Sequence, residues 1–172
     1  ETETAPDELG VEVIGVATAQ EMHDSVMENA SKVDWIFMSA AVADFRPKKV
    51  ASQKIKKEEG IPEILLEPTV DILKALDKAK KRNQLIIGFA AETKNLVENA
   101  SKKLESKNLD FIVANDVSAP GVGFGYDTNS VSIIDRNGAS TEISLCDKRE
   151  IARNIVDIVS KSWSIQGTDP KI

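Results

Sequence analysis

The stretch "QLIIGFAAE" (Gln84–Glu92) decides the fold class of this sequence. It is apolar almost throughout and ends in small residues. Such a run is typical of a strand that is buried on both faces of a sheet, as parallel strands between helices are. Residues 34–43 ("DWIFMSAAVA") and 109–118 ("LDFIVANDVS") have the same character. The sequence therefore predicts three buried strands of a largely parallel sheet.

Apolar residues recur at helical spacing between these strands. Residues 71–82 ("DILKALDKAKKR") place an apolar stripe on one side, and residues 94–107 ("KNLVENASKKLESK") form a second such helix, which we expect Thr93 to cap. A third helix is predicted over residues 147–163. The two inner stripes consist of Ile72, Leu73, Leu76 and Ala79, and of Leu96, Val97, Ala100 and Leu104. Alternating strands and helices indicate an α/β domain.

The ends of the chain add further elements. Residues 11–18 ("VEVIGVAT") predict a strand, and Thr18 with Glu21 predicts a capping box for the next helix, whose stripe is Met22, Val26 and Ala30. Residues 63–67 ("EILLE") predict a short strand. "SVSIID" and "TEISLC" flank an Asn-Gly turn at residues 136–139, which predicts a carboxy-terminal hairpin. We expect one domain over residues 11–162, with loose tails at 1–10 and 163–172.

Composition narrows the classes of function. The chain has 172 residues and a net charge of −6, which argues against broad binding to nucleic acid or to an anionic membrane. No apolar run approaches the roughly 20 residues that cross a bilayer. The single cysteine, Cys146, excludes an intramolecular disulfide and fits a reducing, cytoplasmic compartment. The chain begins at Glu1, so we expect a piece of a longer protein or a processed chain.

Several common site patterns do not occur. Neither GxxxxGK[ST] nor GxGxxG is found, and the glycines at 121, 123 and 125 precede a strand where a phosphate site would need a helix. No His/Cys group has metal-ligand spacing. His23 is the only histidine, and we interpret it as a surface or half-buried residue.

A basic stretch follows the first predicted buried strand. In "DFRPKKVASQKIKK" (residues 44–57), six basic residues and no acid occupy the twelve positions from Arg46 to Lys57. One interpretation is a solvated loop. The other is a loop that closes over a polyphosphate, for which lysine is suited as a mobile point charge. The residues alone leave both open.

Three strand ends carry small or polar residues: "SAAVAD", "GFAAET" and "ANDVS". Ligands of α/β sheets bind outside the carboxyl ends of the strands. Small residues there let a ligand approach the backbone closely. Tight packing of strand against helix explains each triplet taken alone about as well, but three together favour a binding site.

These motifs, in this order, resemble those of phosphopantothenoylcysteine synthetase, from about Val13 to Val159. The resemblance implies a Rossmann-like fold and a homodimer, for which the hairpin is a candidate interface element. It also implies a ligase that uses CTP and Mg²⁺. The carboxylate of 4′-phosphopantothenate would attack the α-phosphate of CTP, and the amine of cysteine would then attack the acyl-cytidylate. The products would be phosphopantothenoylcysteine, CMP and pyrophosphate.

The resemblance also assigns roles to positions. Lys54 matches a flap lysine that stabilises charge on the α-phosphate, and Asp44 matches an acid that contacts the nucleotide. Phe89 would pack near cytosine and ribose, and Lys103 and Lys107 would reach the triphosphate. "VDIL" matches a helix start facing the nucleotide, with valine where the family often has proline. The remaining assignments are Met38, Ser39 and Ala40 as backbone of the nucleotide pocket, Val70, Asp71, Ile72 and Leu73 as that helix start, and Asn115 and Asp116 as substrate-binding residues.

One part of the family pattern is not found. The family begins with a strand and a motif like "NRSSGxMG", which supplies an asparagine for the coupling to cysteine, and this sequence does not contain that motif. A second hypothesis is therefore a nucleotide-binding module without full catalysis. A third, a dinucleotide-dependent oxidoreductase, is disfavoured because GxGxxG is missing.

Overall fold

The computed structural model describes residues 10–56, 58, 60–92, 95–117 and 125–166. The chain divides into two compact units. The arm unit consists of Glu1–Asn29 and Ala41–Ile72, and the sheet unit consists of Ala30–Ala40 and Leu73–Ile172. The single domain expected over residues 11–162 stays a prediction.

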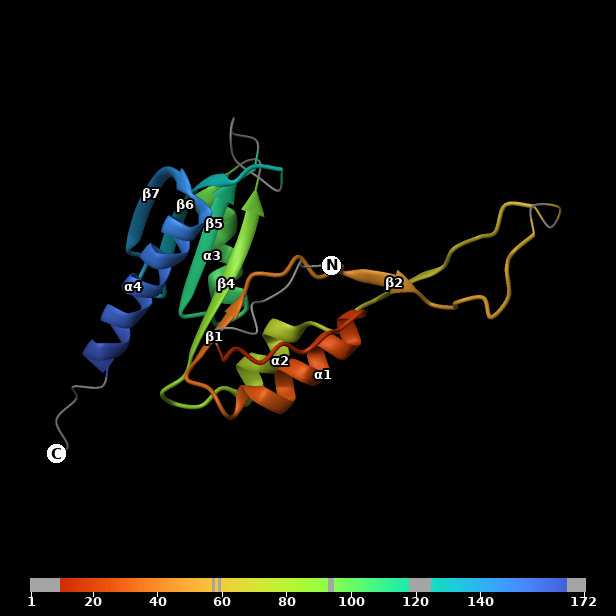
Figure 1. Cartoon of the computed structure of the whole chain (residues 1–172), viewed down its shortest axis with the longest axis horizontal. Helices are drawn as coiled ribbons and strands as arrows, with labels where there is room; N and C mark the ends of the chain where they lie inside the picture. Colours follow the sequence, from red (N-terminus) through yellow and green to blue (C-terminus); the bar gives the residue numbers. More distant parts are fainter. Residues whose placement is uncertain (1–9, 57, 59, 93–94, 118–124, 167–172) are drawn as a thin grey trace. The chain divides into compact units, whose positions relative to one another are not determined.

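A five-stranded sheet forms the centre of the sheet unit (Figure 1), in the order β1-β4-β5-β6-β7. The strands β1, β4 and β5 are parallel to one another, and β6 and β7 add an antiparallel hairpin beyond β5. The strands are β1 Trp35–Met38, β4 Leu85–Glu92, β5 Phe111–Asp116, β6 Thr128–Asp135 and β7 Ser140–Asp147. The predicted α/β class and the predicted hairpin are confirmed.

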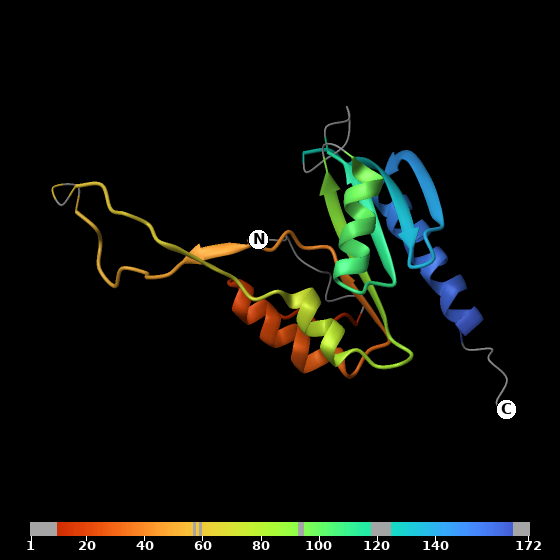
Figure 2. The ribbon, with the colours of Figure 1, turned by 180° about the vertical axis from the view of Figure 1, so that it is seen from behind.

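Helices cover both faces of this sheet. Helix α3 (Leu96–Ser106) and helix α4 (Lys148–Gln166) lie on opposite faces, as Figures 1 and 2 show together. On the α4 face, the strands and helix share one apolar cluster of Leu85, Ile87, Phe111, Val113, Val131, Ile133, Ile151, Ile155 and Val159. On the α3 side, Ala100 and Leu104 are buried. Burial of this apolar surface on both faces is the main stabilising term of the unit.

The hairpin turn follows the predicted chemistry. Gly138 has a φ of +83°, a conformation that glycine adopts without steric cost. Its N–H donates to the carbonyl of Asp135 at 3.0 Å, and the N–H of Asp135 donates to Ala139 at 3.0 Å. The Asn-Gly turn thus closes the β6–β7 ladder where the sequence predicted it.

The arm unit contains most of helix α1 (Ala19–Ala30) and the two-stranded ladder of β2 (Phe45–Pro47) and β3 (Leu66–Pro68). The capping box is confirmed: the Glu21 N–H donates to Thr18 Oγ1 at 3.1 Å, and the Thr18 N–H donates to Glu21 Oε2 at 3.1 Å. Helix α2 (Ile72–Ala79) follows β3, and all of it except Ile72 belongs to the sheet unit. Its Ile72 and Leu76 are buried as predicted, whereas Ala79 is exposed.

Two predicted strands are wrong in part or whole. Residues 11–18 form no strand, because no described strand pairs with this segment, and Val13 and Ile14 there are 59% and 49% exposed. The strand predicted over residues 34–43 is limited to β1. Since β1 is the edge of the sheet and pairs only with β4, it is not buried on both faces, and Phe37 is 37% exposed.

Smaller differences concern element ends. The strand predicted at residues 63–67 lies instead at Leu66–Pro68. Val97 is 54% exposed and so is not part of the buried stripe of α3. The N-cap of α3 is Asn95, and the predicted cap Thr93 lies outside the described residues.

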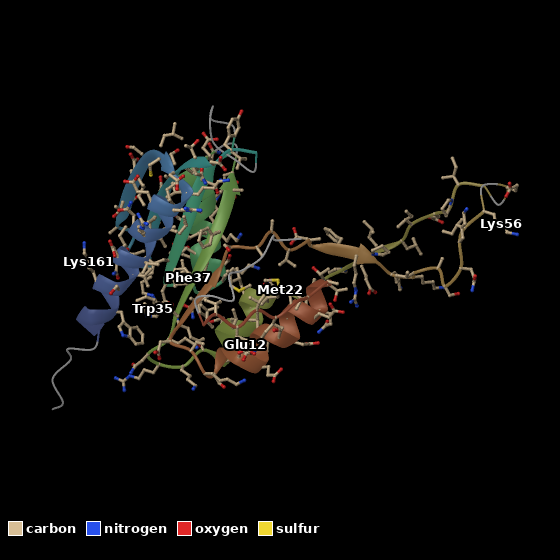
Figure 3. The ribbon with its side chains drawn as sticks, viewed as in Figure 1. Glu12, Met22, Trp35, Phe37, Lys56 and Lys161 are labelled. Carbon is tan, nitrogen blue, oxygen red and sulfur yellow. The ribbon has the colours of Figure 1, made fainter. Side chains whose placement is uncertain are left out.

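An aromatic contact fixes the edge strand β1 to helix α4. The Trp35 ring packs edge-on against Trp163 with centroids 6.2 Å apart, and against Phe37 at 6.5 Å. Figure 3 labels Trp35 and Phe37 on this strand. Edge-to-face pairs of this kind stabilise the fold by more than the area that they bury accounts for. Among the helices of the described residues, none is both long enough and apolar enough to cross a membrane.

Candidate functional site

The carboxyl ends of the parallel strands form a step. Met38, the last residue of β1, pairs with Gly88, whereas β4 and β5 continue side by side to the pair Glu92–Asp116. The last four residues of β4 therefore have a strand neighbour only on the β5 side. Ser39 and Ala40, just past the end of β1, are exposed, and Met38 is buried. Ligands of such sheets bind outside the carboxyl ends of the strands, so this step is the candidate site.

Lys103 of helix α3 lies at this step. Its Nζ donates to the backbone carbonyl of Phe89 at 2.8 Å, and the side chain is half-buried. A lysine ammonium carries three N–H donors and no acceptor. A cation tied by one donor to a strand end can direct the others at an anion. Lys103 therefore lies at the stepped strand ends, and its contact with a triphosphate stays a prediction.

A second contact joins α3 to the same strand end. Asn99 Nδ2 donates to Glu92 Oε2 at 3.0 Å, and both side chains are half-buried. The carbonyl of Glu92 also accepts from the N–H of Val117 at 3.0 Å. Sequence reasoning did not select Glu92 or Asn99 as site residues. The signal was the position of Glu92 at the end of "GFAAET" and the position of Asn99 one helical turn before Lys103.

The other predicted residues of the sheet unit have distinct surroundings. The Phe89 ring packs against the α4-face cluster, so its predicted contact with cytosine stays a prediction. Lys107 is the C-cap of α3 and not a residue of the helix, but its N–H still donates to the Lys103 carbonyl at 3.1 Å. Asn115 and Asp116 are half-buried at the end of β5. Leu73 is half-buried in the first turn of α2.

The arm unit holds the remaining predicted residues. Asp44 and Lys54 are exposed, Val70 and Asp71 are half-buried, and Ile72 is buried. The arm loop, residues 48–65, joins β2 to β3, and Figure 3 shows Lys56 at the end of this loop away from β2. At the base of the loop, the Lys48 N–H donates to the carbonyl of Leu65 at 2.8 Å. Residues 44–56 of the basic stretch are thus exposed along β2 and the arm loop, and Lys57 lies outside the described residues.

The ladder that carries the loop is tied at several points. Arg46 Nε lies 2.8 Å from Glu67 Oε1, so one of the six basic residues is paired with an acid. The Thr69 N–H donates to the carbonyl of Asp44 at 2.9 Å, and Thr69 Oγ1 donates to Ala43 at 2.6 Å. These bonds hold Asp44 and Thr69 together just before β2 and just after β3. The exposed lysines beyond the ladder are Lys48, Lys49, Lys54 and Lys56.

Residues 1–162 match the model of the DNA/pantothenate metabolism flavoprotein C-terminal domain. The chain belongs to this family. It is 44% identical over 149 residues to the coenzyme A biosynthesis bifunctional protein CoaBC of Bacillus subtilis (strain 168), a match that spans 87% of this chain and 36% of that protein. It is 43% identical over 151 residues to a cysteine/cysteine sulfinic acid decarboxylase of an unknown prokaryotic organism, spanning 88% of this chain and 42% of that protein.

A solved structure supports the same family. The crystal structure of the C-terminal domain of a coenzyme A biosynthesis bifunctional protein CoaBC is 41% identical, with a TM-score of 0.75, and the match covers 95% of this chain and 73% of that one. This flavoprotein C-terminal domain spans about two fifths of the length of the curated relatives named above. The relatives support the predicted resemblance at the level of a coenzyme A biosynthesis protein. The reaction that this chain catalyses is a proposal.

This chain also has a charged cavity at the amino ends of the strands, away from the step. The cavity, of about 290 Å³, is lined by Asp110, Lys80, Arg136 and five other polar residues. Asp110 is buried and accepts from Lys80 Nζ at 2.5 Å, from Arg136 Nη2 at 2.8 Å and from the Ile86 N–H at 2.7 Å. Its charge is balanced within the protein. We interpret this cluster as a structural tie between α2, β4, β5 and the hairpin.

Proposed function

We propose that this domain is a CTP-dependent phosphopantothenate–cysteine ligase of coenzyme A biosynthesis. The observation that carries the proposal is the half-buried Lys103 ammonium, held 2.8 Å from the Phe89 carbonyl at the stepped strand ends. The family and the motifs "SAAVAD", "GFAAET" and "ANDVS" support it. The alternative of a nucleotide-binding module without full catalysis predicts the same contacts but no turnover.

The reaction needs cations at defined points. In the first step a carboxylate oxygen of 4′-phosphopantothenate attacks the α-phosphorus of CTP, the bond to the β-phosphate oxygen breaks, and pyrophosphate leaves. In the second step the cysteine nitrogen attacks the acyl carbon, CMP leaves, and the amine loses a proton. The first step brings a carboxylate up to a triphosphate, and in the second step negative charge develops on the acyl oxygen and on the departing CMP, so stabilisation must come from cations and directed donors.

The residues of this chain would share that task. Lys103 would neutralise the triphosphate from the sheet side, with Lys107 one turn further along the chain. Lys54 would meet the reacting α-phosphate when the arm loop closes, as loops that complete a site do. Asp44 would contact the nucleotide. Ser39 and Ala40, exposed past β1, would offer backbone groups to it.

Mg²⁺ is the metal that this proposal requires, and it would supply charge neutralisation on the triphosphate. It commonly binds through one or two carboxylates together with substrate phosphates and waters. No group of three or more potential ligands from His, Cys, Asp and Glu is present among the described residues. Asp116, at the end of β5, offers a single carboxylate, which fits an ion that arrives with the nucleotide.

The test is pyrophosphate release from CTP in the presence of 4′-phosphopantothenate and cysteine, for the parent protein and for Lys54→Gln. Loss of a directed charge at the transition state lowers kcat by about 10²–10³-fold. Lys161→Gln is the matched control, because Lys161 is exposed on α4. Parental rates in Lys54→Gln would refute the role of that lysine. CTP binding by calorimetry without turnover would favour the module.

A decarboxylase is the second candidate function, because one relative at 43% identity is named a cysteine/cysteine sulfinic acid decarboxylase and others are named bifunctional. Release of CO₂ from cysteine or cysteine sulfinic acid, without CTP, would support it. The same preparation can be assayed for both CO₂ and pyrophosphate, so that a single experiment separates the two candidates.

A further inference from the structure

We propose that Glu92 and Asn99 are a positioning pair, whose hydrogen bond holds helix α3 so that Lys103 meets the nucleotide triphosphate. This inference rests on the proposed CTP-binding function and deepens it. The pair lies on the sheet unit alone, with Glu92 at the end of β4 and Asn99 in the first turn of α3. Neither residue needs to touch the nucleotide for the pair to act.

The geometry of α3 supports the inference. Asn99 and Lys103 are four residues apart, so they lie on the same face of the helix. Asn99 donates to Glu92 Oε2 at 3.0 Å, and Lys103 donates to the Phe89 carbonyl at 2.8 Å. Both acceptors belong to the last four residues of β4. The helix is therefore fastened to the strand end at two points, one turn apart, and Lys103 is the second of them.

The start of α3 depends on the first of these points. Its N-cap, Asn95, has a left-handed backbone and makes no side-chain cap hydrogen bond among the described residues. A helix without this bond has N-terminal N–H groups that its own cap does not satisfy. The contact of Asn99 with Glu92 then fixes the first turn in place of the cap. Further along, buried Ala100 and Leu104 fix only how deep the helix packs.

A small displacement would matter because the lysine acts by position. A shift of about 1 Å in a group that orients a reacting substrate can cost about 10²-fold in rate. The hydrogen bond needs an acceptor at Glu92, and the negative charge of Glu92 would itself oppose an anionic ligand. The positioning role therefore predicts that glutamine can replace Glu92, because its amide oxygen accepts the same bond.

The experiment measures the Kd for CTP by calorimetry for the parent, Asn99→Leu and Glu92→Gln. We expect Asn99→Leu, which removes the donor at similar volume, to raise the Kd about tenfold, the scale of one lost hydrogen bond. Glu92→Gln should stay within about twofold of the parent. Glu98→Gln is the control on the same helix, because it removes only the exposed ion pair with Lys102.

A double-mutant cycle separates positioning from general stability. In a Lys103→Met background, Asn99→Leu should change the Kd for CTP by less than twofold, since the residue it positions is gone. A purely structural role would give the same loss in both backgrounds and would overturn the inference. A loss in Glu92→Gln as large as in Asn99→Leu would also overturn it, because the carboxylate charge would then be required.

CTP binding by the parent protein separates failure of the positioning role from failure of the proposed function. If the parent binds CTP and Asn99→Leu binds it equally well, the positioning role is refuted and the proposed function stands. If the parent binds no CTP, in the presence of Mg²⁺ and 4′-phosphopantothenate, the proposed function is refuted and the inference falls with it.

Discussion

Replacing Asp110 by alanine should be the most destabilising single change at a polar residue of the sheet unit. Asp110 is 4% exposed and precedes β5. Its carboxylate accepts from the Ile86 N–H at 2.7 Å, from Lys80 Nζ at 2.5 Å and from Arg136 Nη2 at 2.8 Å. Strand β4, the segment just after α2 and the hairpin turn therefore lose a shared acceptor when the carboxylate is removed.

The size of the effect follows from the burial of each partner. Lys80 is only 14% exposed, and removing one partner of a buried ion pair costs about 3–5 kcal/mol. The Ile86 N–H, left without its acceptor, contributes about 1–3 kcal/mol within that sum. Arg136 is 46% exposed, so its guanidinium can return to water and adds little. We expect Asp110→Ala to lower the free energy of unfolding by about 3–5 kcal/mol.

Urea unfolding and thermal unfolding of the purified chain measure this quantity. For a chain of 150–250 residues, 1 kcal/mol corresponds to about 2–4 °C in Tm, so the shift should be roughly 6–20 °C. Asp110→Ala combined with Lys80→Met should lose less than the sum of the single changes, because the second change removes the unpaired buried cation. A loss below about 1 kcal/mol in Asp110→Ala, or strict additivity, would refute the reasoning.

Three further outcomes are expected. Gly88→Ala should lower the free energy of unfolding by about 1–3 kcal/mol, because the added Cβ would lie 2.5 Å from Leu109 Cδ1. In a chain that already carries Leu109→Ala, the cost of Gly88→Ala should be smaller, and urea unfolding measures the free energy of each variant. Thr18→Ala should cost about 0.5–2 kcal/mol through loss of the capping box, seen as faster hydrogen exchange in the first turn of α1, and unchanged exchange would contradict it. Desolvation raises the pKa of the Cys146 thiol, and the charges of Glu150 and Asp147 add to the rise. Because the thiolate is the reactive form, the folded chain should react with a disulfide reagent more slowly at pH 8 than the urea-unfolded chain. Equal rates would refute this.

The sequence predicts best those elements that one local pattern defines completely. Strands β4 and β5 are continuous apolar runs, and their burial needs no knowledge of neighbours beyond the flanking helices. The capping box of Thr18 and the turn at Gly138 are local hydrogen-bond patterns with specific residue requirements. Each of these predictions was confirmed because its cause lies within a few residues.

The misassigned elements depend on which strands meet. Residues 11–18 have the composition of a strand, but a strand also needs a partner for its backbone groups, and partner choice is a property of the whole fold. In the same way, the run 34–43 contains an edge strand of four residues, because the strand order places β1 beside β4 alone. Composition does not reveal an edge position.

The residues of the candidate site likewise differ in whether the sequence alone or only the whole fold identifies them. Lys103 could be predicted from the resemblance, since a charged side chain at a fixed position is visible in the sequence. Its partner, the carbonyl of Phe89, is a backbone atom and leaves no mark on the residue type. The pair Glu92–Asn99 consists of two visible side chains seven residues apart, but only the step between β1 and β4 makes that place significant.

The distribution of the basic residues bears on how the proposed reaction would proceed. Lys103, Lys80 and Arg46 each contact a partner within the fold, whereas Lys54 lies exposed on the arm loop. A site made only of fixed cations would bind CTP and the departing pyrophosphate alike, so release of pyrophosphate would be slow and would limit kcat. A fixed lysine that receives the triphosphate, with further lysines on a loop that can open, lets charge stabilisation be strong during the reaction and weak at release. On this reasoning, Lys103→Met should mainly raise the Kd for CTP, whereas Lys54→Gln should mainly lower kcat. Equal effects of both changes on Kd and kcat would contradict this division between a fixed and a closing cation.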